Sequence, residues 1–144
     1  MNRQINFDMD GTIANLYGIE NWFEYLLAKD ETPYREAKPL VNLSVLARML
    51  NKLQKEGYRI CIISWLARTT DANYDAKVTL AKVQWLQKRM PSVKWDEINI
   101  LPYGTPKYMF GSGILFDDEE RNRVAWGEGA YDVDNIIEVL KRLR

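Results

Sequence analysis

Histidine is absent from this 144-residue sequence. The absence excludes phosphohistidine chemistry, an imidazole general base and any metal site built on histidine ligands. The single cysteine, Cys61, cannot form an intramolecular disulfide and lies in an apolar run, which favours a reducing compartment. Carboxylates, hydroxyl groups and cationic side chains must therefore carry out any chemistry.

Net charge and long apolar runs are also missing. Twenty Lys and Arg side chains balance 20 Asp and Glu, so the formal net charge at pH 7 is zero. A protein that binds polyanions normally carries a basic excess, so we expect neither a polynucleotide nor a membrane surface as partner. No apolar stretch approaches the roughly 18 residues of a membrane span, and the N-terminus lacks a signal-peptide core. We expect a cytoplasmic protein.

The apolar content that is present suits one compact domain spanning residues 1–144. Hydrophobic residues make up 47% of the chain, and its length corresponds to a single domain. Short apolar runs typical of buried strands alternate with segments whose apolar residues recur at helical spacing. The expected strands are residues 5–8, 58–63, 97–101 and 113–116, and the expected helices are residues 43–55, 74–90 and 134–143.

This alternation predicts an α/β fold with a doubly wound parallel sheet covered on both faces. Ligands of such sheets bind beyond the carboxyl ends of the strands, so the polar residues there are the functional candidates. Two segments depart from the alternation. Residues 15–39 form an insertion that is long for a connection, which we interpret as a small cap-like lid. The step from Lys107 to Asp117 is too short for a full helix.

The first expected strand leads into Asp8-Met9-Asp10-Gly11-Thr12. If the strand continues, Asp8 and Asp10 point the same way and converge. If the chain turns after Asp8, Gly11 gives the backbone the freedom to curl. Two carboxylates this close repel each other, which favours a bound cation or one retained proton. Asp and Gly are also common turn residues, so a simple turn is the alternative interpretation.

Polar residues follow the other expected strands as well. Ser64 follows the second strand, and its hydroxyl could donate to a phosphate oxygen, although a serine there is commonly a turn or cap residue. Lys107 comes after the third strand and, taken alone, is typical of a solvated surface lysine. The fourth strand ends at Asp117 and Asp118, whose oxygens are hard ligands suited to Mg²⁺. An acidic helix start is the alternative there.

In this order, the segments resemble the four motifs of the haloacid dehalogenase superfamily. Residues 7–12 resemble the first motif, Ser64 the second, Lys107 the third and the pair Asp117-Asp118 the fourth. The Asp-x-Asp form of the first motif implies phosphatase chemistry rather than dehalogenation. The resemblance covers the whole chain apart from the insertion.

Within that superfamily, the short step between the third and fourth motifs is similar to the 5′(3′)-deoxyribonucleotidase branch. So is the expected helix around residues 83–86 that leads to the strand at 98–101. Trp65 departs from the pattern, because the branch usually carries a smaller residue there, and the insertion is shorter than the cap of that branch. Both departures concern the substrate rather than the phosphatase core.

The resemblance implies a Mg²⁺-dependent phosphomonoester hydrolase with an aspartyl-phosphate intermediate. Asp8 would be the nucleophile, and Asp10 would protonate the leaving oxygen and later deprotonate the attacking water. The carboxylates of Asp8 and Asp117 and the backbone carbonyl of Asp10 would hold Mg²⁺. Asp118 would act through a water or orient Lys107, whose charge helps a carboxylate to approach a phosphate.

The substrate implied by the resemblance is a small phosphate ester such as a (deoxy)nucleoside monophosphate. Ser64 and the backbone N–H groups of Met9 and Trp65 would bind the phosphoryl oxygens. Tyr17 and Trp65 are the expected substrate contacts because they lie near the motifs in sequence, and Arg68 would add a phosphate or ribose contact. The alternatives are a polynucleotide 3′-phosphatase or another phosphotransferase on the same scaffold and, in a different class, a non-catalytic phospho-acceptor module such as a receiver domain.

Overall fold

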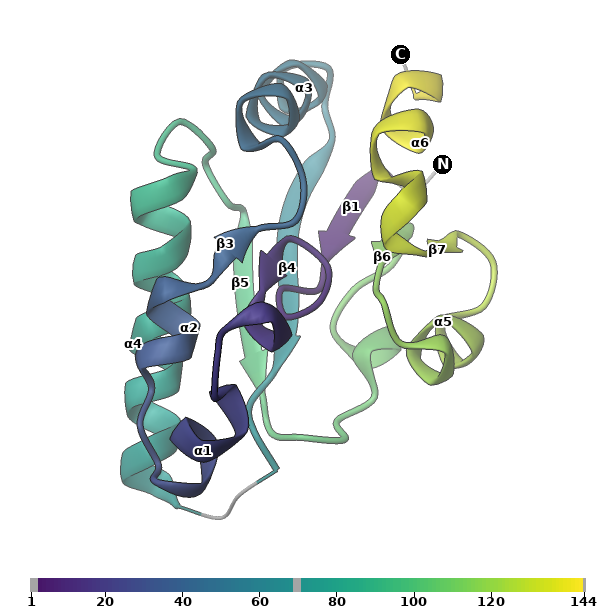
Figure 1. The fold of residues 1–144 in the computed structure, drawn as a ribbon. Coiled ribbons are helices and arrows are strands. Elements are labelled where there is room, and N and C mark those ends of the chain that lie inside the picture. The colour runs from purple at the N-terminus through teal and green to yellow at the C-terminus, as the bar shows by residue number, and fades with distance from the viewer. Residues whose placement is uncertain (1–2, 69–70, 144) are drawn as a thin grey trace.

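A five-stranded parallel sheet with the strand order β5-β4-β1-β6-β7 lies at the centre of the computed structural model, which describes residues 3–68 and 71–143 (Figure 1). The prediction of a parallel α/β sheet is confirmed, and all four expected strands are present. The additional strand β7 has only two residues, too few to show a pattern in the sequence. The strands are β1 (Gln4–Phe7), β4 (Arg59–Trp65), β5 (Glu97–Leu101), β6 (Ile114–Phe116) and β7 (Ala130–Tyr131).

Three helices build the main core against one face of this sheet. They are α3 (Leu43–Lys55), α4 (Ala72–Arg89) and α6 (Ile136–Arg142), close to the predicted bounds. Every second residue of a strand points to the same face of the sheet. On this face Phe7 of β1 and its neighbour Ile62 of β4 pack in one cluster with Trp85 of α4. None of the helices within the described residues is long and apolar enough to span a membrane.

A loop rather than a long helix lies against the opposite face. The connection from β5 to β6 contains only a 3-10 turn, η2 (Lys107–Met109), as expected from the short step to Asp117. Asn6 of β1 donates to the carbonyls of Ser112 (2.8 Å) and Ile114 (2.9 Å). The turn η2 packs against α5 (Glu120–Trp126). Because this loop packs directly against β1, Lys107 lies at the carboxyl edge of the sheet.

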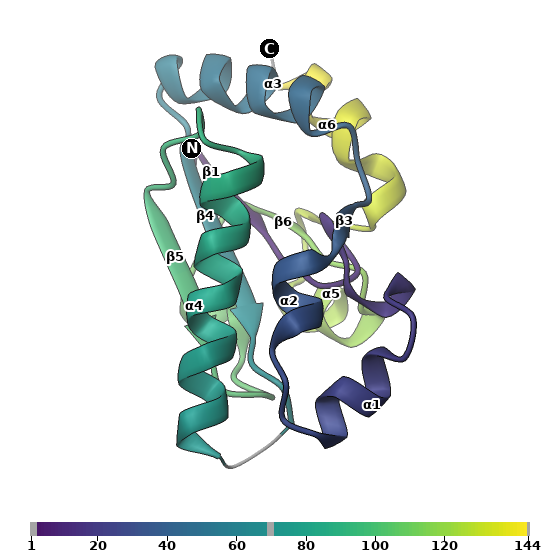
Figure 2. The ribbon, with the colours of Figure 1, turned by 60° about the vertical axis from the view of Figure 1, so that its left-hand side comes forward.

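Residues 15–39, the predicted cap-like insertion, are called the cap below, and their action as a lid stays a prediction. The cap holds the turn η1 (Leu16–Gly18) and the helices α1 (Trp22–Leu27) and α2 (Thr32–Glu36). Its base is closed by an antiparallel pair, β2 (Ala14–Asn15) with β3 (Lys38–Pro39). Helix α2 packs against α4, which runs along the sheet, and α2 lies toward the carboxyl ends of the strands (Figure 2). The cap therefore stands next to the edge where ligands of parallel sheets bind.

Candidate active site

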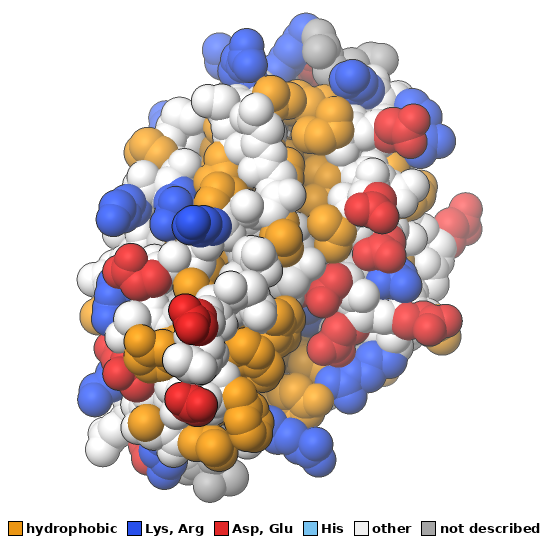
Figure 3. Space-filling model, in the orientation of Figure 1, with side chains coloured by type: hydrophobic (Ala, Val, Ile, Leu, Met, Phe, Trp, Pro, Cys, Tyr) orange, Lys and Arg blue, Asp and Glu red, His pale blue; other side chains and the backbone are white. Residues whose placement is uncertain are grey.

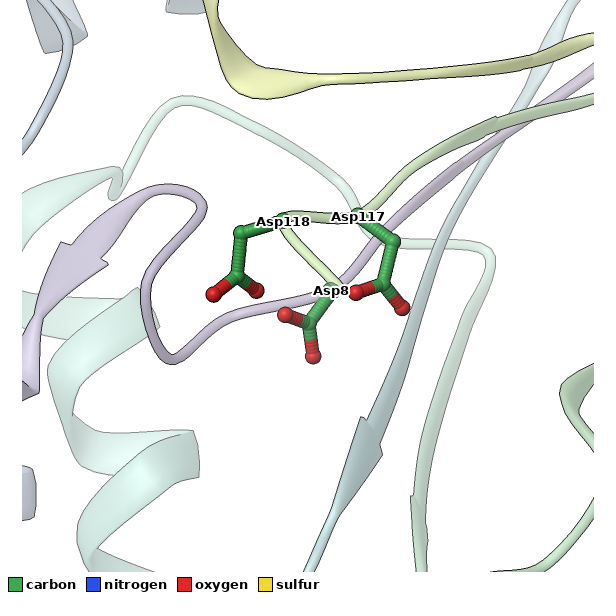
Figure 4. Close-up of side chains that lie close together, drawn as sticks. All are labelled: Asp8, Asp117 and Asp118. Carbon is green, nitrogen blue, oxygen red and sulfur yellow. The ribbon is translucent and has the colours of Figure 1, made fainter. Parts of the chain in front are cut away.

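Three carboxylates converge beyond the ends of two neighbouring central strands. Asp8 follows β1, and Asp117 and Asp118 follow β6. One oxygen of each lies within 4.8 Å of the others, and Figure 4 shows the three side chains pointing in the same direction. Carboxylate oxygens are the ligands that Mg²⁺ prefers, so this donor set fits a divalent cation.

Lys107 lies between two of these carboxylates. Its Nζ is 2.9 Å from Oδ1 of Asp8 and 2.7 Å from Oδ2 of Asp117, and its side chain is only 3% exposed. A buried ammonium is tolerated only when it is paired, and these two ion pairs meet that need.

One ammonium does not balance three carboxylates, so the cluster keeps an excess of negative charge. Burial, with the neighbouring charge of Asp8, raises the pKa of Asp117 from 3.8 to about 6. The same two causes raise the pKa of Asp118 from 3.8 to about 8. Carboxyl groups that resist ionisation in this way are stabilised by a bound cation, which supports the fit to Mg²⁺.

The chain turns directly after Asp8, which decides between the two geometries that the sequence allows. The carbonyl of Met9 accepts the N–H groups of residues 12–14, each at 3.0 Å. Gly11 has a φ of +82°, and a Cβ at this position would collide with the carboxylate of Asp118. Glycine is therefore needed here both for the left-handed backbone and for the close approach of the two strand ends.

Asp118 contacts the first motif through Thr12. The Thr12 hydroxyl lies 3.0 Å from Oδ2 of Asp8 and 3.3 Å from Oδ1 of Asp118. Among the described residues, Lys107 forms its ion pairs with Asp8 and Asp117, so the expectation that Asp118 orients Lys107 is wrong. Asp117 contacts Lys107, whereas Asp118 contacts Thr12 in the turn after β1. Action of Asp118 through a water stays a prediction.

The carboxylate of Asp10 faces a second buried lysine, which the sequence reasoning missed. Nζ of Lys82 lies 2.9 Å from Oδ2 of Asp10. Burial raises the pKa of Asp10 against the opposing effect of Lys82, and the negative charge of Asp8 adds to the rise. The Asp10 carboxylate is separate from the three-carboxylate cluster, so only its backbone carbonyl is left as the expected metal ligand.

A sequence signal for Lys82 does exist. It lies four residues after Val78 and three before Trp85, in the apolar stripe that α4 turns toward the core. A charged residue within such a stripe points to a buried, paired ion.

Ser64 and Met9 lie behind the site surface. The Ser64 side chain is fully buried, and its Oγ accepts a hydrogen bond of 2.7 Å from Lys82. The Met9 side chain is packed in the core, so only its backbone is available for a contact with substrate. Their expected contacts with phosphoryl oxygens stay predictions.

A cavity of about 190 Å³ opens in front of the carboxylates. Figure 3 shows hydrophobic side chains gathered between the cap and a group of acidic side chains on this face. Polar groups form one wall and aromatic rings from the cap form another. Among the lining residues are Asp8, Asp10, Lys107, Trp22 and Tyr34.

The three expected substrate contacts also line this cavity. Tyr17 is half exposed and packs edge-on against Trp22, with ring centroids 5.1 Å apart. The Trp65 indole N–H donates to the Thr105 carbonyl at 2.8 Å, which holds the ring in place. The guanidinium of Arg68 lies 5.6 Å from the centroid of a nearby tyrosine ring. Contact of any of the three with a substrate stays a prediction.

Comparison with known proteins finds a similar fold but no related sequence. No family model matches the chain, and no curated protein matches it. Among solved structures, the chain is similar to the D,D-heptose 1,7-bisphosphate phosphatase from Burkholderia thailandensis, with a TM-score of 0.59 and 13% sequence identity. The alignment covers 98% of this chain and 97% of that one. A similarity at this level of identity concerns the fold, and it agrees with the predicted parallel α/β core.

Proposed function

We propose that this chain is a Mg²⁺-dependent phosphomonoester hydrolase that forms an aspartyl-phosphate on Asp8. The observation that carries the proposal is the position of Asp8, which lines the cavity, pairs with Lys107 and lies close to the two carboxylates that follow β6. The fold similarity to a phosphatase supports it. Neither the nucleophile nor the acid requires an imidazole, in keeping with a chain that lacks histidine.

In the first step, Asp8 attacks phosphorus, and the bond from phosphorus to the leaving oxygen breaks. Asp10 lines the same cavity and gives its proton to that oxygen. In the second step, water attacks the phosphoryl group, Asp10 takes a proton from this water, and Asp8 is released as a carboxylate. The raised pKa of Asp10 suits the first of these roles, because an acid must hold its proton until the leaving oxygen needs it.

Two positive charges offset the repulsion between Asp8 and an anionic phosphate. Lys107 supplies one from within the protein. Asp8, Asp117 and Asp118 would hold Mg²⁺, which would supply the other charge at the phosphoryl group. Asn122 donates to Asp117 at 3.1 Å and keeps that carboxylate oriented.

The cavity favours a small phosphate ester. Its volume is below the roughly 300–1,000 Å³ typical of drug-sized ligand sites, so the phosphoryl group and a small part of the substrate fill it. Rings of Tyr17 and Trp65 line the walls and offer stacking surfaces for a base. A (deoxy)nucleoside monophosphate matches this combination of a small anionic pocket and aromatic walls.

A phosphate-release screen tests the function. Nucleoside monophosphates, sugar phosphates and a DNA 3′-phosphate are each incubated with the protein, with and without Mg²⁺. We expect multiple turnovers that need Mg²⁺ and are fastest with a nucleoside monophosphate. Fastest release from the DNA end would identify a polynucleotide 3′-phosphatase instead. Incorporation of one phosphate per chain without turnover would identify a phospho-acceptor module.

A further inference from the structure

Lys82 is a buried cation whose hydrogen-bonding capacity is fully used. Its side chain is 1% exposed, and its Nζ lies within bonding distance of three oxygens. These are Oδ2 of Asp10 at 2.9 Å, Oγ of Ser64 at 2.7 Å and the carbonyl of Trp65 at 2.6 Å. An ammonium has three N–H donors, so each donor has one acceptor.

Stability alone does not account for a lysine at this position. The neighbouring positions of the α4 stripe are apolar, and an apolar side chain of similar length would avoid the cost of desolvating a charge. The three acceptors all belong to segments at the carboxyl ends of β1 and β4, next to the cavity. The contacts of Lys82 therefore concern the candidate site rather than the packing of the helix.

The contact with Ser64 determines what its hydroxyl can do. Because Lys82 donates to Oγ, that oxygen acts as an acceptor, and the hydroxyl hydrogen is left to donate elsewhere. The contact with Asp10 acts in the same way on a carboxyl group. Oδ2 accepts from the ammonium, so a proton on Asp10 must be carried by Oδ1.

We propose that Lys82 is a positioning residue that orients the Asp10 carboxyl group as the proton donor to the leaving oxygen and holds the Ser64 hydroxyl as a donor. This role rests on the proposed phosphatase function. Lys82 itself does not touch the substrate, since its side chain is buried behind Asp10 and is not part of the cavity wall.

Two esters that differ in their leaving group test this role. An aryl ester such as 4-nitrophenyl phosphate needs little proton donation, whereas an alkyl ester such as glycerol 2-phosphate depends on it. The ratio kcat/KM reports the steps up to release of the alcohol. We expect Lys82→Met to lower kcat/KM about 100-fold for the alkyl ester and less than about 10-fold for the aryl ester. Equal losses for both esters would overturn the proposal, because a merely loosened site does not distinguish leaving groups.

The matched control is Lys88→Met, which makes the same change at an exposed position of the same helix. We expect this control to leave kcat/KM unchanged for both esters. A double-mutant cycle adds a second readout. If Lys82 acts through Asp10, then Asp10→Asn and Lys82→Met together lose no more alkyl-ester activity than Asp10→Asn alone. Losses that multiply would contradict action through Asp10.

Lys82→Arg covers the case in which Lys82→Met does not fold. Arginine keeps the buried charge, but its planar head cannot place three donors as the ammonium does. The same leaving-group-selective loss is expected, and equal losses again overturn the proposal. If the wild-type protein hydrolyses neither these esters nor any substrate of the phosphate-release screen, the proposed function fails, and the crystal structure of the folded Lys82 variant decides the positioning role separately. A rotated Asp10 carboxylate supports it, and an unmoved Asp10 contradicts it.

Discussion

Nζ of Lys107 lies 2.9 Å from Oδ1 of Asp8, although 99 residues of sequence separate the two. The contact joins the end of β1 to the loop after β5. The same ammonium reaches Asp117 at the end of β6. The Lys107 ammonium therefore links the loop after β5 to the ends of β1 and β6, next to the cavity.

Removal of this cation should destabilise the protein. Lys107→Met leaves Asp8 and Asp117 buried without their partner, and breaking a buried pair in this way costs about 3–5 kcal/mol. Urea unfolding in the presence of a chelator measures the change in the free energy of unfolding. The exposed Lys52→Met serves as the control and should change it by less than about 0.5 kcal/mol. Similar values for the two variants would contradict the ion pairs.

The metal-free carboxylate cluster should make stability depend on pH. Asp118 has its pKa raised to about 8 in the folded protein, so above its ordinary pKa of 3.8 the folded state holds more protons than the unfolded state. Stability from this group is then present below about pH 4 and is lost as the pH rises through 8.

Asp118→Asn isolates this effect, because asparagine cannot ionise. In chelator, we expect the variant to gain stability relative to the wild-type protein as the pH rises from 4 to 8. Urea unfolding at several pH values measures the difference. A difference that does not vary with pH would show that Asp118 titrates normally.

The three carboxylates should bind a divalent cation in solution. Calorimetric titration with Mg²⁺, or electron paramagnetic resonance with Mn²⁺, measures the affinity without any substrate. Asp118→Asn should weaken binding at least about tenfold, because one of three charged oxygen ligands is lost. Asp134→Asn, at an exposed position in the turn before α6, should leave the affinity unchanged. Equal affinities for the two variants would exclude Asp118 as a ligand.

Tyr17 should contribute to substrate binding if the substrate carries a base. Tyr17→Ala should raise KM for a nucleoside monophosphate about tenfold, the effect of losing about 1–3 kcal/mol of stacking. KM for ribose 5-phosphate, which has no base, should not change. Phe23→Ala is the matched control, since both rings pack edge-on against Trp22 but only Tyr17 lines the cavity. Equal effects of the two substitutions would indicate a general loosening of the cap.

Local patterns in the sequence were sufficient for much of the fold. The leucine stripe followed by Gly57 located α3, and the apolar run at 58–63 located β4. The expected parallel pairing brings Asp8 and Asp117 to one edge, whereas the strand order is known only from the structure. The position of residues 102–113 on the sheet could not be predicted, because it depends on side-chain contacts such as that of Asn6 with Ser112.

The second cation of the site was missed for a related reason. A lysine in a helix is usually solvated, so Lys82 was not considered although it interrupts an apolar stripe. Its partners, Asp10 and Ser64, are 72 and 18 residues away along the chain, and no local pattern links them. Orientation of Lys107 was one of two roles expected for Asp118, but Lys107 pairs with Asp117, and Asp118 contacts Thr12 instead.

Trapping of the intermediate on Asp8 tests the central claim most directly. The protein is mixed with Mg²⁺ and a phosphate ester during turnover, quenched and treated with borohydride, which reduces an aspartyl-phosphate to homoserine. Peptide mass spectrometry then locates the modified residue. We predict homoserine at position 8 in the wild-type protein and none in Asp8→Asn, which also loses turnover. Substantial turnover by Asp8→Asn, or a reduced residue elsewhere in the chain, would contradict the account.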